Sequence, residues 1–223
     1  HPESLSQLRA GPHPPGLQQA EKLQHPTRCL RHDSSVTHFA DRNCPQSMKA
    51  CRYDMATQLA DQLDWHWTNA LRPPRLDGLT DDEYFWEPVA GCWTVHRDGG
   101  IDFAFPPPQP EPVTTIAWRL AHVIVGVLAM RNHSHFGGPP ADYQSWPYAT
   151  DATTALAQLD DAYARWITGL RGGLSDDDLA RPCGPAEGPY ADYALSELIL
   201  HINREVIHHG AEIACLRDLY AHQ

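Results

Sequence analysis

With 223 residues, of which 42% are hydrophobic, the chain is long enough to form one well-filled domain. Its formal net charge of −11 argues against a nucleic-acid partner, because phosphate binding needs a clustered basic surface. No apolar run approaches the roughly 18 to 20 residues that a membrane-spanning helix needs, and the first residues lack a signal-peptide pattern. We therefore expect a cytoplasmic protein without a membrane partner, whose six scattered cysteines are reduced thiols.

The composition changes near residue 53. Residues 1–53 are rich in proline, histidine, glutamine and serine, and neither helical nor strand periodicity persists there. We expect this segment to be an irregular or disordered N-terminal extension. Residues 54–223 have the apolar periodicity of a helical domain.

Two helices are expected in the first half of this domain. The first covers about 55–71 and should end before Pro73 and Pro74, because proline interrupts helical hydrogen bonding. The second covers about 115–132 and is apolar on nearly every side, which predicts a helix surrounded by protein. The long connection between them, roughly 72–113, is typical of a crossing connection or a functional loop.

Two further helices are expected in the second half. One begins after an Asp151 cap and ends near Leu170, because Gly172 and Gly173 follow. After a loop rich in proline and glycine, the last helix covers about 192–219. Four helices around one core predict an all-α four-helix bundle with long crossing connections.

The last predicted helix carries two polar residues on its apolar side. With about 100° of rotation per residue, His209 falls in the middle of the apolar stripe and Glu205 lies close to it. A buried carboxylate is unfavourable unless a cation or strong donors compensate its charge. Residues four apart lie one above the other on a helix, so both could bind one divalent ion. A buried hydrogen-bonded pair without a metal is the alternative.

A third ligand could come from the second predicted helix. His122 is the only ionisable residue in the apolar run 120–129, and Gly126 leaves room beside its ring. Together with Glu205 and His209 it would form a two-histidine, one-carboxylate set with open coordination positions, which is typical of catalytic sites. A histidine in an apolar helix could equally be a hydrogen-bonded core residue.

Two stretches of the sequence resemble the DinB-like superfamily, whose members are four-helix bundles that bind a divalent metal. They are TTIAWRLAH at 114–122 and INREVIHHG at 202–210, and the resemblance extends from about residue 55 to the end of the chain. It implies a metal held by a histidine on the second helix and by two ligands four residues apart on the fourth.

The resemblance assigns these ligand positions to His122, Glu205 and His209. Many members have histidine where this chain has Glu205, so the set looks more like the metal-binding domain of mycothiol-dependent maleylpyruvate isomerase, in which a His, Glu, His set holds zinc. Zinc is therefore the metal expected first, with nickel, manganese or iron as alternatives. Whether His201 or His208 is an additional ligand stays open.

The resemblance also implies an activity, because characterised relatives are thiol-dependent transferases and isomerases. The expected substrate is a small electrophile, and the expected co-substrate is a small thiol such as mycothiol or bacillithiol, whose pKa a bound cation would lower. One alternative is a metal-dependent hydrolase, in which the ion activates water. Another is a non-catalytic, stress-related bundle in which the metal stabilises the fold or a homodimer.

Four further residues are candidates for direct roles in catalysis. Arg119 and Arg204 could hold a substrate carboxylate, although arginines commonly lie at the rim of an amphipathic helix. His66 or His208 could act as the general base that hydrolysis needs. An amphipathic flank position for His66 and a solvent-facing position for His208 are the simpler alternatives.

Overall fold

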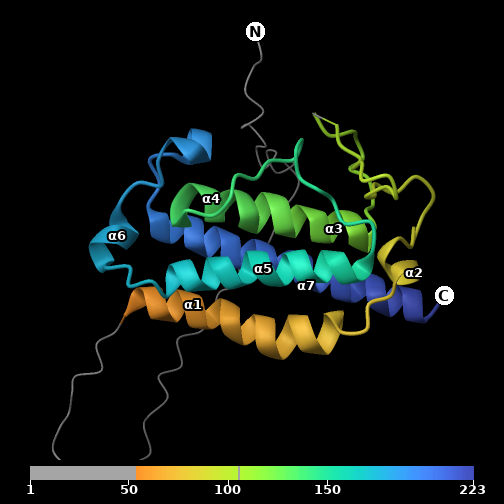
Figure 1. Ribbon diagram of the computed structural model, residues 1–223, viewed down its shortest axis with the longest axis horizontal. Coiled ribbons are helices and arrows are strands. Elements are labelled where there is room, and N and C mark those ends of the chain that lie inside the picture. Colours follow the sequence, from red (N-terminus) through yellow and green to blue (C-terminus); the bar gives the residue numbers. More distant parts are fainter. Residues whose placement is uncertain (1–53, 105) are drawn as a thin grey trace, which may run out of the picture. The chain divides into compact units, whose positions relative to one another are not determined.

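The computed structural model describes residues 54–104 and 106–223 (Figure 1). The N-terminal extension expected at 1–53 lies outside the described residues. Within them the secondary structure is helical, with three isolated β-bridges and no strand, so the predicted all-α class is confirmed. Residues 54–223 form one compact unit. In the part that the structure describes, no helix combines the length and apolar character that crossing a membrane requires.

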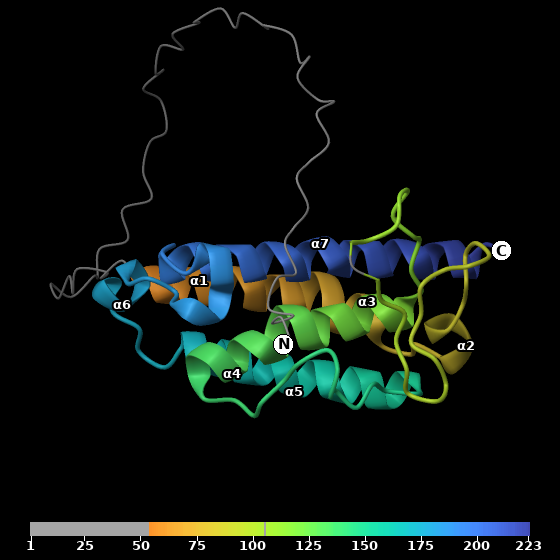
Figure 2. The same ribbon diagram turned by 90° about the horizontal axis from the view of Figure 1, so that it is seen from above.

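Four long helical rods make up the bundle (Figures 1 and 2). The first rod is α1 (Met55–His66), which continues directly into η1 (Trp67–Leu76). The second consists of α3 (Ile116–His122), η2 (Val123–Ala129) and α4 (Met130–Phe136) in direct succession. The third and fourth rods are α5 (Ala152–Leu170) and α7 (Leu195–Ala221).

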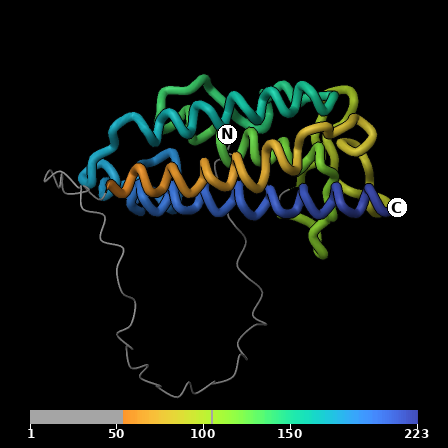
Figure 3. Tube along the Cα trace, turned by 90° about the horizontal axis from the view of Figure 1, so that it is seen from below, coloured from red at the N-terminus to blue at the C-terminus, as the bar shows by residue number. Residues whose placement is uncertain are grey.

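The rods pack in a ring around one core. Helix α7 contacts α1 on one side and the α3–η2–α4 rod on the other, and α5 contacts the same two rods from the opposite side. Figure 3 shows α1 and α7 running side by side. The second rod is buried along its middle, since every residue of η2 is buried, as its apolar sequence predicts. Fully buried residues from all four rods, among them Leu63, Ile124, Trp166 and Ile199, fill the centre.

The predicted end of the first helix was wrong. The helix continues through Pro73 and Pro74 to Leu76 in η1, a segment of wider π-type turns. Wider turns give the proline rings room against the preceding carbonyl groups, which a regular α-helix lacks. The end of the segment is also held from outside, because Arg217 of α7 donates hydrogen bonds to the carbonyl oxygens of Arg75 and Asp77.

The third helix has the predicted limits. The Asp151 side chain accepts a hydrogen bond from the Thr154 backbone N–H and caps the first turn of α5. At the other end the chain turns away at Gly172 and Gly173, and Gly173 has a φ of 91°, which favours glycine. The fourth helix begins at Leu195 and ends at Ala221, close to the predicted limits.

The two long connections carry short elements. The first contains α2 (Asp81–Tyr84) and two bridges, Val95 with Ile101 and Trp93 with Thr114, and it leads into the Thr115 cap of α3. The second contains α6 (Asp176–Ala180) and η3 (Pro185–Tyr190), which precede α7.

Candidate metal centre

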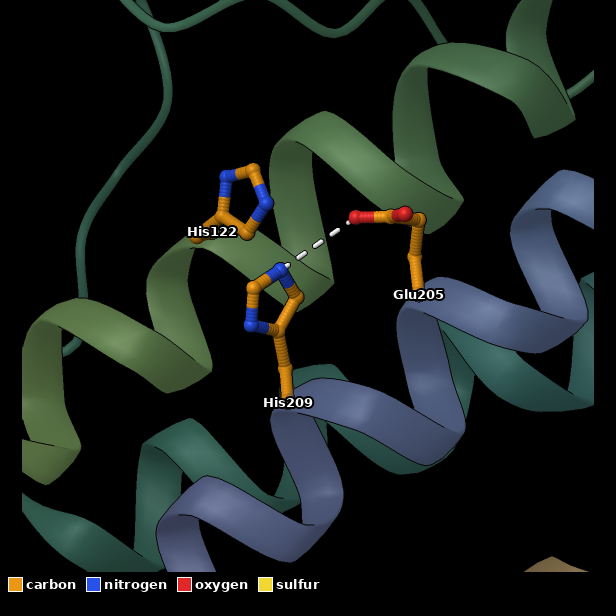
Figure 4. A group of neighbouring side chains, drawn as sticks. All are labelled: His122, Glu205 and His209. Carbon is orange, nitrogen blue, oxygen red and sulfur yellow. Dashed lines mark ion pairs between the residues drawn. The ribbon is translucent and has the colours of Figure 1, made fainter. Parts of the chain in front are cut away.

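Three side chains from two rods converge between these rods (Figure 4). His122 is the last residue of α3, at the point where the helix changes to the π-type turns of η2. Glu205 and His209 lie one turn apart on α7. Each of the three offers a ligand atom, and these atoms all lie within 4.8 Å of one another. The two imidazole rings meet edge to face with their centroids 4.7 Å apart.

The spacing of these atoms suits a small divalent ion. Two atoms bound to one zinc ion at roughly 2.0 to 2.2 Å in tetrahedral geometry lie about 3.4 Å apart. Nε2 of His209 lies 3.4 Å from Oε2 of Glu205, as the dashed line in Figure 4 marks. The ligand atom of His122 lies within 4.8 Å of a ligand atom of each of these two residues. The donor set of two nitrogens and one carboxylate therefore fits zinc in its chemistry, and the His209–Glu205 pair also has the spacing of two zinc ligands.

The Nδ1 atoms of both histidines already have partners. Nδ1 of His122 lies 2.9 Å from the Tyr143 hydroxyl, and Nδ1 of His209 lies 2.6 Å from Oε2 of Glu212. Histidines that bind metals usually donate their other ring N–H to a carboxylate or another acceptor, which fixes the orientation of the ring. This pattern leaves Nε2 of each histidine for the ion.

The electrostatics of the group favour a bound cation. A hydrogen bond with His209 lowers the pKa of Glu205 to about 2, although partial burial opposes this, so the carboxylate is ionised at neutral pH. Burial, with contributions from His209 and Arg119, lowers the pKa of His122 to about 3, so its imidazole is neutral and able to bind a metal. For His209, burial lowers the pKa, but hydrogen bonds with Glu205 and Glu212 outweigh that effect and raise it.

The structure places the other candidate residues at different distances from this group. Arg119, one turn before His122, directs its Nε to Oε2 of Glu212 at 3.1 Å, so its guanidinium is already engaged. Arg204 has a side chain that is 70% exposed and lies 3.8 Å from Oε1 of Glu205. His208 is exposed, and its Nε2 lies 3.3 Å from Oε1 of Glu212.

The structure does not bring His66 to the group. Its ring lies beside Gly210 in a hollow between the first rod and α7, which is also lined by Arg75 and Cys215. Gly210 follows His209 directly, and consecutive helical residues point about 100° apart, so this hollow lies on another side of α7. His66 is therefore not placed to act as a base at the ion.

A second set of potential ligands, formed by His208, His209 and Glu212, also has its atoms within 4.8 Å. It is less suited to a cation, because the positively charged Arg119 already contacts Glu212. His201, the other candidate for an extra ligand, has its Nδ1 3.5 Å from Oε1 of Glu205 and 2.7 Å from a terminal guanidinium nitrogen of Arg204. Within the part of the chain that the structure describes, His201 does not join either set.

Sequence reasoning missed two residues of the site, Glu212 and Tyr143. Glu212 could have been found, because it lies three residues after His209 and seven after Glu205, on the same side of the helix. Tyr143 gave no such signal. It lies in the irregular connection between α4 and α5, where no periodicity indicates which side chains turn inward.

A helical bundle in which two histidines and a carboxylate from two rods converge defines a class of protein that is able to hold a divalent ion. The family model of the DinB superfamily matches residues 62–213, and this chain belongs to that superfamily. The superfamily includes metal-binding enzymes. No curated protein and no solved structure matches the chain.

Proposed function

We propose that this chain is a divalent-metal-dependent enzyme, with zinc bound by His122, Glu205 and His209, that acts as a thiol-dependent transferase or isomerase on a small electrophile. The observation that carries the proposal is the set of three converging ligand atoms, with both Nδ1 atoms held by other residues. Three protein ligands leave coordination positions open, and open positions are typical of catalytic sites. The Glu205 ligand resembles that of mycothiol-dependent maleylpyruvate isomerase, which points to a thiol co-substrate.

Bound zinc would supply a positive charge that lowers the pKa of a thiol such as mycothiol or bacillithiol, so that the reactive thiolate exists near neutral pH. The residues of the chain would hold the ion and orient the reactants beside it. Glu205 remains ionised because its pKa is low, and it offsets one of the two charges of the ion. Arg204 has an exposed guanidinium beside Glu205 and would bind a carboxylate of the substrate at the rim.

In the transfer reaction, the thiol sulfur forms a bond to the electrophilic carbon of the substrate. The bond from that carbon to the leaving group breaks, and the leaving group departs with the electron pair. The thiol proton passes to solvent. In an isomerisation, the same sulfur adds to a carbon–carbon double bond, the resulting single bond rotates, and the sulfur then leaves with its electron pair to restore the double bond and the thiol.

The test combines metal content with turnover. We expect purified protein to carry about one zinc ion per chain, and His122→Ala, Glu205→Gln and His209→Ala to carry much less. His133→Ala is the matched control, because His133 lies exposed on α4 and bonds the Gly138 carbonyl oxygen instead. Thiol consumption is then followed with mycothiol, bacillithiol and cysteine against an aryl halide, an epoxide and a cis-enone. Equal metal content in all variants, or no turnover by zinc-loaded protein with any pair, would contradict the proposal.

Metal-assisted hydrolysis is the second candidate, and the pair of His208 and Glu212 favours it. A histidine next to a carboxylate is the arrangement that a general base needs, and His208 lies directly beside the ligand His209. Zinc-loaded protein would then turn over esters or amides without a thiol, and His208→Ala would lower that rate. A purely structural ion would instead give loss of the fold on metal removal and no turnover of either kind.

A further inference from the structure

Tyr143 connects an irregular loop to the candidate metal centre. Its hydroxyl lies 2.9 Å from Nδ1 of His122. The loop around it is held in place, because the Tyr148 hydroxyl donates a 2.7 Å hydrogen bond to the Tyr143 carbonyl oxygen. The phenol ring also stacks on Phe103 of the first long connection, with centroids 6.3 Å apart. The hydroxyl is therefore directed at the imidazole by contacts on both sides.

Gly126 provides the space in which this hydroxyl lies. A Cβ atom at position 126 would lie 1.8 Å from the Tyr143 hydroxyl oxygen and 2.8 Å from the ring carbon that bears it. Non-bonded atoms do not approach this closely, so any other residue at position 126 would displace the Tyr143 side chain. Gly126 lies within η2, one turn after His122, and is buried. A glycine inside a buried helix is unfavourable without such a packing reason.

We propose that Tyr143, seated against Gly126, is a positioning residue that orients His122 so that its Nε2 faces the ion. The proposal rests on the metal site proposed above. An imidazole that binds a metal through Nε2 carries its single proton on Nδ1, and the hydroxyl oxygen is placed to accept that hydrogen bond. Tyr143 therefore does for His122 what the Glu212 carboxylate does for His209.

The test compares zinc affinity in Tyr143→Phe, Gly126→Ala and the double variant, measured by competition with a chromogenic chelator. Tyr143→Phe removes only the hydroxyl, and we expect it to weaken zinc binding by about 10- to 100-fold. Gly126→Ala should weaken binding in the same range without altering any ligand. Since the hydrogen bond is already absent in Tyr143→Phe, Gly126→Ala should weaken zinc binding less in that background than in the wild-type chain.

Two controls separate positioning from a general loss of structure. Tyr84→Phe removes another buried hydroxyl, which bonds the Ala149 carbonyl oxygen, and it should leave zinc affinity unchanged. The ¹⁵N chemical shifts of His122 in zinc-loaded protein report which ring nitrogen carries the proton. We expect a protonated Nδ1 and a metal-bound Nε2 in wild type, and a loss of that single pattern in Tyr143→Phe.

The outcomes distinguish this inference from the proposed function. Zinc binding that requires His122 and His209, combined with an unchanged affinity in Tyr143→Phe, would overturn the positioning role alone. Zinc bound through Nδ1 of His122 would overturn it as well. Absence of zinc binding by the wild-type chain would contradict both proposals.

Discussion

The imidazole rings of His122 and His209 meet edge to face at a centroid distance of 4.7 Å, although they belong to different rods of the bundle. An ion shared by the two rings would link α3 to α7. A ligand that binds only the folded state stabilises it, by about 4 kcal/mol when its concentration is a thousand times its Kd. We therefore predict that zinc raises the melting temperature of the wild-type chain but not that of His122→Ala. A rise of equal size in both proteins would place the stabilising ion elsewhere.

Glu212 is predicted to support zinc binding without being a ligand. Glu212→Gln keeps the shape of the side chain but removes the charge that holds Nδ1 of His209. We expect zinc affinity to fall by about 10- to 100-fold while the stoichiometry stays the same. Glu197→Gln, at an exposed position in the first turn of the same helix, is the control. A loss of stoichiometry in Glu212→Gln would indicate that this carboxylate binds the ion directly.

The stability of the metal-free protein should depend on pH through His122. Burial lowers the pKa of this imidazole from 6.5 to about 3, so below pH 6.5 the unfolded chain binds a proton that the folded chain does not. Acidification from pH 6.5 to about pH 5 therefore lowers the free energy of unfolding. Glu205 does not change the free energy of unfolding between pH 6.5 and about 5. Its lowered pKa stabilises the folded chain above pH 4.5, and this stabilisation is lost only as the pH falls from 4.5 toward about 2.

His209 does not cancel the effect of His122 on stability between pH 6.5 and about 5. Because its pKa is raised in the folded chain, the stability that it contributes is fully present below pH 6.5 and is lost only at higher pH. The measurement is urea unfolding in the presence of a chelator, for wild type and His122→Asn. The variant should show a weaker dependence on pH between 6.5 and about 5. The same slope in both proteins would mean that His122 titrates normally in the folded chain.

Glu83 is predicted to stabilise the packing of the first long connection against α7. Its carboxylate is buried and binds the Arg217 guanidinium through two contacts of 2.9 and 3.0 Å. Removing one partner of a buried ion pair leaves the other charge unpaired, so Glu83→Ala should cost about 3 kcal/mol in the free energy of unfolding. Chemical denaturation of the metal-free protein measures this loss. A loss below about 1 kcal/mol, as for a surface ion pair, would contradict the structural role.

The position of His66 predicts that it does not influence the metal centre. His66→Ala should leave zinc content and zinc affinity as in wild type, because its ring lies in the hollow beside Gly210. His208→Ala, which changes a neighbour of the ligand His209, is the comparison. A weaker zinc affinity in His66→Ala than in His208→Ala would contradict the prediction that His66 does not influence the metal centre.

The elements with strong local signals could be predicted from the sequence. The Asp151 cap and the glycines after Leu170 fixed α5, because capping and left-handed turns depend on single residue types. The end of the first helix could not be predicted from Pro73 and Pro74. There, the hydrogen bonds from Arg217 and the widened turns of η1 outweigh the local preference of proline.

The same distinction applies to the candidate site. Glu205 and His209 could be found from the sequence because a polar pair on the apolar side of a helix is unfavourable without a partner. His122 could be found because it is the only ionisable residue in an apolar run. Tyr143 could not be found from the sequence, because the position of its side chain depends on how an irregular loop packs against Gly126. Arg119 was only a candidate for binding a substrate carboxylate, and its contact with Glu212 could not be predicted because it depends on how α3 and α7 pack together.

Anomalous diffraction from crystals of zinc-loaded protein, recorded at the zinc absorption edge, tests the central claim most directly. We predict one strong peak within roughly 2.0 to 2.2 Å of Nε2 of His122, Nε2 of His209 and a carboxylate oxygen of Glu205. A peak between His208 and Glu212, or no ordered zinc near α7, would contradict the metal centre and the activity proposed for it.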